Sequence, residues 1–249
     1  MVAPNGARRS KKHHPNIPLS DEALIEAVIQ CQREGADGAH LHIRDENGAH
    51  LLDANRYQKL LERLQKASPA MYLQVTSESA GVYTSDQQQA MMRVLKPRYV
   101  SVAMREMVRC PEDWTEATNF YDWANSNNVQ IHHILYSPSE LKTFISAVSE
   151  GKIQGNHHLL LFVLGNYDGT EISEPKNVSA YTKLLQEAPN DLSFDWMLCA
   201  FGKEETTCLV EAVRQGGKAR IGFENSLWNS NGSLANDNAE RVAELVSCL

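Results

Sequence analysis

The sequence lacks an apolar run long enough to cross a membrane, which takes roughly 18 or more consecutive residues. The opening residues, MVAPNGARRS, lack the apolar core of a secretory signal, so we expect a cytoplasmic protein. The five cysteines form no CxxC pair and leave an odd number, which favours reduced thiols over a disulfide framework. The chain has no excess of positive charge, and its net charge of −7 leads us to expect no nucleic-acid partner. The missing apolar run leads us to expect no membrane partner.

What the chain contains is an alternation of short apolar segments with helical patterns. The apolar segments cover residues 2–3, 39–43, 71–76, 99–103, 129–135, 159–164, 192–198 and 219–223. Between them apolar residues recur at intervals of three and four, as in the stretch that follows the cap signal Ser20-Asp21-Glu22. Strands that alternate with helices predict a parallel sheet. Eight such units in 249 residues predict one TIM-barrel domain, a (β/α)8 fold over residues 1–249 with a short first strand.

The alternative fold is an open, doubly wound sheet. Such a sheet usually carries a GxGxxG or GxxxxGK[ST] nucleotide motif, and neither occurs in this chain. We therefore favour the closed barrel.

The stretch GAHLHIRDENGAH, residues 38–50, holds the first candidate site. His40 and His42 are two residues apart, and side chains with that spacing share one face of a strand. At the carboxyl end of the second predicted strand they would lie on the active face of a barrel. Two imidazoles fixed side by side form half of a zinc site. The alternative is a pair of histidines held by hydrogen bonds in a polar barrel core.

A third zinc ligand should come from the same end of another strand. The eighth predicted strand leads into Glu224, and in a closed barrel that strand is separated from the second only by the first. Two histidines and a glutamate form a catalytic zinc set with open positions. Glu224 alone would be read as a surface carboxylate at a strand end. Of the other histidines, His132 is an alternative ligand or substrate contact, whereas His157 and His158 lie at the amino end of their strand and are predicted to be structural.

Several segments resemble the β-keto acid cleavage enzyme family: VAPNGARRSKKHHPNIPLS, GAHLHIRD, LLFVLG and RIGFENSLW, followed by SNGSLANDNAERV. The resemblance runs from Met1 to about Val246. A known member cleaves 3-keto-5-aminohexanoate in lysine fermentation. The resemblance implies a zinc-dependent TIM barrel that forms a homo-oligomer, a tetramer or a dimer. It also implies two small-molecule partners, a β-keto acid and the co-substrate acetyl-CoA, with acetoacetate as co-product, and it places zinc on His40, His42 and Glu224.

The resemblance also implies roles for other residues. Arg220 matches the family's catalytic arginine, and its place four residues before Glu224 predicts that both share a face of the eighth strand. Thr76 and Ser77, which end the third predicted strand, match a pair that donates to the substrate carboxylate. Lys203 follows the seventh strand, where barrels often bind phosphate, and is predicted to bind CoA unless it is simply solvated.

Two positions depart from the family pattern. The catalytic position that holds a deprotonating aspartate in the characterised enzyme is Asn225 here, and an amide cannot act as a base. Deprotonation would then depend on zinc, on another group such as Asp45, or on solvent. Arg8 stands where the characterised enzyme has a glutamate for the substrate amino group, which predicts a substrate whose far end is anionic or neutral.

These departures leave two rival functions beside the acyl transfer from a β-keto acid to CoA. One is a zinc-dependent aldolase or lyase that acts without CoA. The other is a zinc- and ligand-binding barrel that has lost catalysis, which Asn225 suggests.

Overall fold

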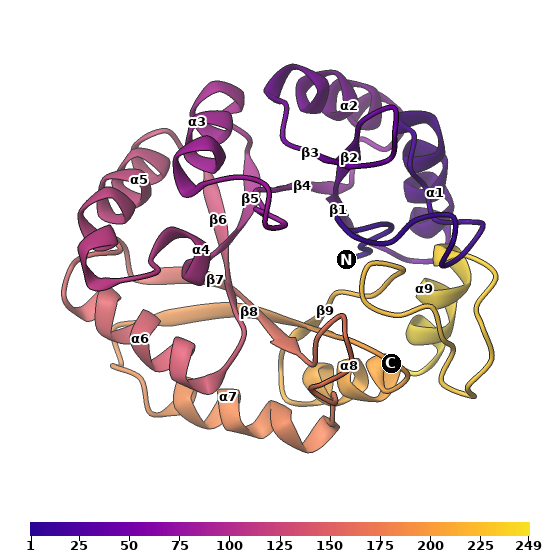
Figure 1. The fold of residues 1–249 in the computed structure, drawn as a ribbon. Coiled ribbons are helices and arrows are strands. Elements are labelled where there is room, and N and C mark those ends of the chain that lie inside the picture. The colour runs from indigo at the N-terminus through magenta and orange to yellow at the C-terminus, as the bar shows by residue number, and fades with distance from the viewer.

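The computed structural model describes residues 1–249 as a ring of parallel strands surrounded by helices (Figure 1). The strands are β1 (Gly38–Leu41), β2 (Ile43–Arg44), β3 (His50–Leu51), β4 (Tyr72–Thr76), β5 (Tyr99–Ala103), β6 (Gln130–Leu135), β7 (His157–Leu164), β8 (Ser193–Ala200) and β9 (Lys218–Ala219). The helices are α1 (Asp21–Arg33), α2 (Ala54–Ala67), α3 (Ser85–Leu95), α4 (Met104–Met107), α5 (Trp114–Ser126), α6 (Pro138–Ser149), α7 (Val178–Gln186), α8 (Glu205–Arg214) and α9 (Asn238–Ser247), with short 3-10 turns η1 (Pro111–Asp113) and η2 (Pro175–Asn177).

The barrel is closed at its first position by the residues Met1 to Ala3, with Val2 as the paired residue. Seven strands form one parallel sheet in the order β1-β4-β5-β6-β7-β8-β9. Val2 joins the two edges of this sheet through parallel bridges to Ala39 on β1 and to Ile221 just beyond β9. We call these three residues the seam. The short first strand of the prediction is thus one residue that pairs on both sides, and the predicted TIM-barrel fold is confirmed.

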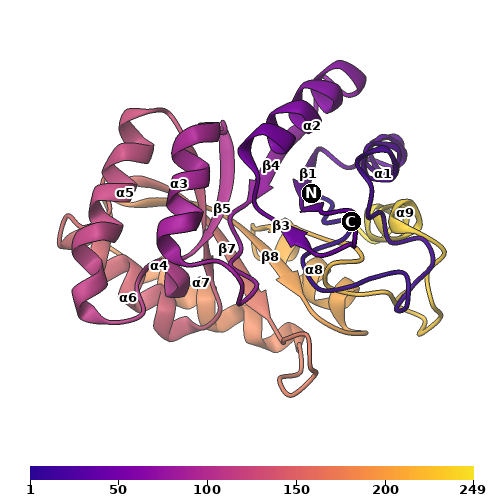
Figure 2. The ribbon, with the colours of Figure 1, turned by 45° about the horizontal axis from the view of Figure 1, so that its top comes forward.

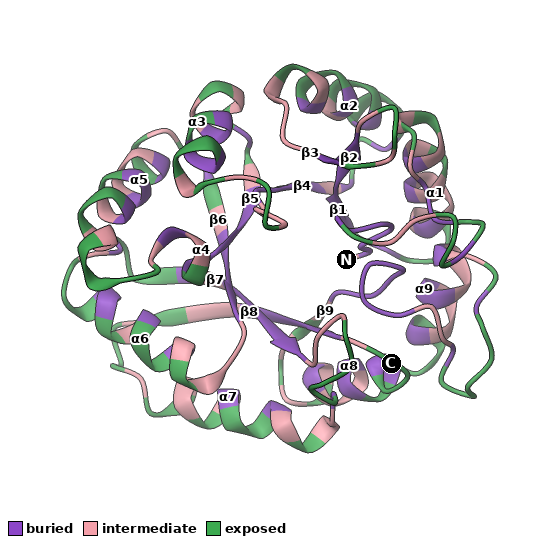
Figure 3. Cartoon of the chain, viewed as in Figure 1, coloured by how far each residue is buried: buried purple, intermediate pink, exposed green.

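The helices form where the sequence pattern places them. Ser20 caps α1, because its hydroxyl oxygen accepts from the backbone N–H of Ala23. The residues that recur at helical spacing, Leu24, Val28 and Cys31, are the ones that α1 buries. Buried residues lie on the sides of the helices toward the strands, and exposed residues lie on their outer sides (Figure 3). The helices lie outside the strands in the turned view as well (Figure 2). None of the helices has both the length and the apolar composition needed to span a bilayer.

Two predicted strands are shorter than the sequence suggested. The segment 39–43 ends as a barrel strand at Leu41, and β2 instead pairs with β3 in a separate antiparallel ribbon. The segment 219–223 leaves the sheet because the chain turns at Gly222, whose φ is +140°. A β-carbon there would lie 2.5 Å from the carbonyl oxygen of Ala3, so the turn requires glycine. Glu224 is therefore placed by a turn and not by the end of a strand.

Candidate active site

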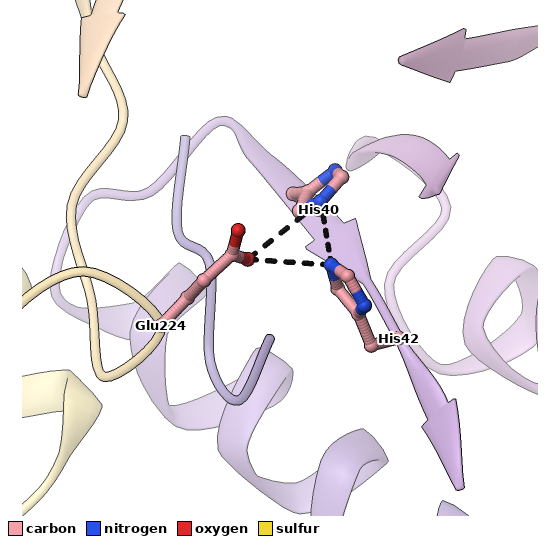
Figure 4. A group of neighbouring side chains, drawn as sticks. All are labelled: His40, His42 and Glu224. Atoms are coloured by element: carbon pink, nitrogen blue, oxygen red, sulfur yellow. Dashed lines mark hydrogen bonds and ion pairs between the residues drawn. The ribbon is translucent and has the colours of Figure 1, made fainter. Parts of the chain in front are cut away.

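His40, His42 and Glu224 converge at the carboxyl ends of the strands (Figure 4). The Nε2 atoms of the two histidines lie 3.0 Å apart. The Oε2 atom of Glu224 lies 3.6 Å from Nε2 of His40 and 3.5 Å from Nε2 of His42. All three side chains are nearly fully buried. The structure thus brings together the three residues that the sequence proposed as ligands.

The protonation states of this group fit a divalent cation. Burial lowers the pKa of His40 well below its usual value, so its ring is neutral near pH 7. Burial alone would raise the pKa of Glu224, but the Arg220 guanidinium holds it well below its ordinary value, and the carboxyl is ionised. Its Oε2 atom is buried without a hydrogen-bond partner. An unpartnered carboxylate oxygen facing two imidazole nitrogens is a donor set that suits zinc.

The turn that carries Glu224 is anchored from several sides. The backbone N–H of Phe223 donates to Oδ1 of Asn238, at the start of α9, over 2.8 Å. Arg9 donates to the backbone carbonyls of Phe223 and Asn225, at 3.1 and 2.9 Å. Arg9 lies in the segment ARRSKK, residues 7–12, which carries four basic residues, and here it positions a main-chain turn. These contacts fix the carboxylate opposite the two histidines.

Arg220 lies beside this group and is buried. Its Nη2 atom donates to Oε1 of Glu224 at 3.1 Å and approaches Sγ of Cys199 at 3.3 Å. This contact occupies the carboxylate oxygen that faces away from the histidines and leaves Oε2 free. Arg220 also lines the central cavity, and its Nε atom has no hydrogen-bond partner. The guanidinium therefore places a positive charge at the cavity wall, and its Nε donor is buried and unpaired.

The cavity above these residues has a volume of about 410 Å³, which suits a small organic substrate. Its floor includes His40, Glu224 and Arg220, and its rim includes Arg8 and Glu78. The remaining walls are formed by Thr76, Ala103, Arg105, Glu106, Ile134, Tyr136, Ser137, Val163, Gly165, Asn166, Tyr167, Glu171 and Phe201. The cavity thus combines a floor rich in ligand and donor atoms with a mixed polar and apolar wall.

A model of the family described as beta-keto acid cleavage enzyme matches residues 1–249. This chain belongs to the beta-keto acid cleavage enzyme family. The family resemblance seen in the sequence and the prediction that the chain is an enzyme are both confirmed.

Relatives with assigned activities align along most of the chain. It is 25% identical to the 3-keto-5-aminohexanoate cleavage enzyme of Acetoanaerobium sticklandii, over 97% of this chain and 87% of the relative. It is 21% identical to the 3-oxoadipate:acetyl-CoA acetyltransferase of Cupriavidus necator, over 99% of this chain and 86% of the relative. Among solved structures, a ternary complex of ObcA with a C4-CoA adduct and oxalate aligns with 94% of the chain at a TM-score of 0.71 and 14% identity. The chain spans 63% of that ObcA chain, and this likeness shows the fold.

The hydroxyl groups of Thr76 and Ser77 point to opposite sides of the barrel wall, because successive side chains of a strand alternate between its two faces. Thr76 lines the cavity, whereas Ser77 is buried outside it and donates its hydroxyl to the carbonyl oxygen of Ser101 at 2.8 Å. Glu78, two residues beyond Thr76, returns to the cavity face. Our reading of the sequence missed Glu78, although the spacing rule used for His40 and His42 applies to it equally.

Glu78 is the partner of Arg8. The Nε atom of Arg8 lies 3.7 Å from Oε1 of Glu78, and its guanidinium stands 5.5 Å from the ring centre of Tyr167. The Arg8 side chain is 53% exposed, while that of Glu78 is 19% exposed. The other Glu78 oxygen lies 3.9 Å from Nε2 of His42. The rim of the cavity therefore presents a cation paired with a carboxylate, where the sequence suggested a cation alone.

The remaining sequence candidates do not line the cavity of the enzyme. The Asn225 side chain is buried behind the cavity, and its Oδ1 atom lies 3.4 Å from Nη2 of Arg220. Asp45 caps its own turn by accepting from the backbone of Asn47 and Ala49, so it is not directed at the histidines. Lys203 is exposed, with its ammonium group 4.7 Å from the ring centre of Trp228.

Proposed function

We propose that this family member is a zinc-dependent acyltransferase that converts a β-keto acid and acetyl-CoA into an acyl-CoA and acetoacetate. The observation that carries the proposal is the convergence of Nε2 of His40, Nε2 of His42 and the unpartnered Oε2 of Glu224 beside a cavity that His40 and Glu224 line. The names of the relatives support the substrate pair, since they describe transfer between keto acids and acetyl-CoA.

The reaction exchanges one carbon–carbon bond for another. The carbon between the keto and carboxylate groups loses a proton and attacks the carbonyl of acetyl-CoA, which releases the CoA thiolate. The thiolate then attacks the original keto carbon, and the bond from that carbon to the attacking carbon breaks. The products are the acyl-CoA and, after a proton returns, acetoacetate. A bound zinc ion supplies Lewis acidity, which makes the first deprotonation easier.

The side chains of the cavity would assist these steps by position and charge. His40, His42 and Glu224 would hold the ion. Arg220, which lines the cavity, would stabilise the negative oxygen that develops at each attack. The Thr76 hydroxyl would bind the substrate carboxylate. Asn225 would act through its contact with Arg220, because an amide accepts no proton at neutral pH.

We expect the purified, zinc-loaded enzyme to release one acetoacetate for each β-keto acid consumed, and to do so only when acetyl-CoA is present. The assay is a panel of β-keto acids with and without acetyl-CoA. Loss of the keto acid without acetyl-CoA would favour an aldolase or lyase instead. Stoichiometric zinc and tight ligand binding without turnover would favour the binding barrel that Asn225 suggests.

We expect Arg8 to select the charge of the substrate tail. A tail that is anionic or neutral should be preferred over an ammonium tail, because Arg8 offers a planar set of donors at the rim. In Arg8→Glu the new carboxylate would stand beside Glu78, so the preference should reverse toward the ammonium tail. For a half-exposed charge the change in kcat/KM should be on the order of fivefold.

The measurement is kcat/KM for matched β-keto acids that end in carboxylate, methyl or ammonium. Lys12→Glu is the matched control, since it makes the same charge change in the same loop at an exposed position that does not line the cavity. A wild-type preference for the ammonium substrate, or an unchanged ranking in Arg8→Glu, would rule out contact between Arg8 and the tail.

A further inference from the structure

We propose that Gln74 and His132 are positioning residues that orient His40 so that its Nε2 atom is free to bind the metal. This inference rests on the proposed function, because it concerns the same zinc site. Neither residue lines the cavity, so they would act through His40 and not on the substrate.

The contact between Gln74 and His40 is built into the barrel. Gln74 on β4 is the register partner of His40 on β1, and both side chains are about 1% exposed. The side-chain oxygen of Gln74, Oε1, lies 2.8 Å from Nδ1 of His40. This is the ring nitrogen that faces away from His42 and Glu224. Histidines that bind metals commonly donate from this second nitrogen to an oxygen, which fixes the ring and its tautomer.

His132 sets which way the amide of Gln74 points. Nδ1 of His132 lies 2.5 Å from Nε2 of Gln74 and 3.3 Å from the hydroxyl of Tyr72. Burial lowers the pKa of His132 to about 4, so the ring is neutral at pH 7 and its Nδ1 can accept. In the structure the amide nitrogen of Gln74 faces His132 and its oxygen faces His40. Because an amide nitrogen can only donate, Nδ1 of His132 accepts.

The direction of this chain of hydrogen bonds decides where the proton of His40 lies. An amide oxygen can only accept, so Nδ1 of His40 must carry the hydrogen. A neutral imidazole has one ring N–H, and Nε2 is then left with a lone pair that faces Oε2 of Glu224. If the amide were reversed, Nδ1 would accept, the hydrogen would move to Nε2, and His40 could not bind a metal through that atom.

The surroundings show that this arrangement is specific to one of the two histidines. The corresponding Nδ1 atom of His42 is buried without a partner. Between β4 and β6, the strand β5 places Ser101 as the register partner of His132. Its side chain is small, and its own hydroxyl has no partner. Ser101 therefore provides a control position in the same part of the barrel.

The first test is made on the metal-free wild-type enzyme. Nitrogen-15 NMR of the histidine rings should show His40 as a single tautomer with the hydrogen on Nδ1, assigned by comparison with His40→Gln. His40 carrying its hydrogen on Nε2, or a mixture of the two tautomers, would overturn the proposal, and no mutation of Gln74 is needed to obtain this result.

The second test is zinc affinity, measured by competition with a chromophoric chelator. Gln74→Leu should lower the affinity about 10- to 100-fold, as loss of a metal ligand's hydrogen-bond partner typically does. His132→Phe should cause a smaller loss and a mixed tautomer of His40, because Gln74 can then turn. Ser101→Ala should change neither. Equal zinc affinity of wild type and Gln74→Leu would overturn this inference alone, whereas a wild type that binds no zinc would overturn the proposed function.

Discussion

Alanine at His40 or at His42 should give a folded barrel that retains no stoichiometric zinc and no measurable turnover of a β-keto acid. Each change leaves two of the three side chains that face one another within the buried group. Catalytic zinc sites use three protein ligands, and losing one should cost more than the roughly 100-fold that follows loss of an outer hydrogen-bond partner. The measurement is zinc content by mass spectrometry after dialysis, together with the acetoacetate assay.

The matched control for these variants is His157→Ala. His157 is exposed at the amino end of β7 and does not approach the site, so this variant should keep both zinc and activity. Circular dichroism checks that each variant is folded. Full zinc occupancy in His40→Ala or His42→Ala would show that the ligand assignment is wrong.

Arg220→Met should reduce kcat by about 100-fold or more, because removing a preorganised donor from a site of developing negative charge has effects of that size. Methionine retains much of the side-chain volume but no charge. Zinc should remain bound, since Oε2 of Glu224 does not depend on the arginine for a partner. The loss should therefore appear in turnover more than in zinc content or in melting temperature.

To isolate the role of Arg220, kcat and zinc content should both be measured on the same preparation of each variant. Arg220→Lys, which keeps the charge but lacks the planar set of donors, should lie between wild type and Arg220→Met. An unchanged kcat in the methionine variant would show that Arg220 does not act on the reacting groups. Loss of zinc in parallel with kcat would instead show that it serves to hold Glu224.

The parts of the site that obey a local rule were predictable from the sequence. His40 and His42 meet because residues two apart on an extended strand share a face. The same rule explains why Thr76 reaches the cavity and Ser77 does not. It would also have identified Glu78, so that residue was missed by our reading and not by a lack of signal.

Other features depend on contacts between distant parts of the chain, and no local pattern encodes them. Glu224 was expected at a strand end, but a turn at Gly222 delivers it, and Arg9 holds that turn from more than two hundred residues away. The pairing of Arg8 with Glu78 is of the same kind. The sequence could supply the residue types, whereas the tertiary fold decided their partners.

The seam has a consequence for the stability of the barrel. Two of the site's residues, His40 and His42, follow one side of the seam, and Glu224 follows the other. A cation held by all three would link the first and last parts of the ring, whose backbones are joined there through the N-terminal residues Met1 to Ala3. Any ligand that binds only the closed form shifts the equilibrium toward it, by an amount that grows with the logarithm of its free concentration. Metal availability and resistance to opening of the ring would then be linked thermodynamically.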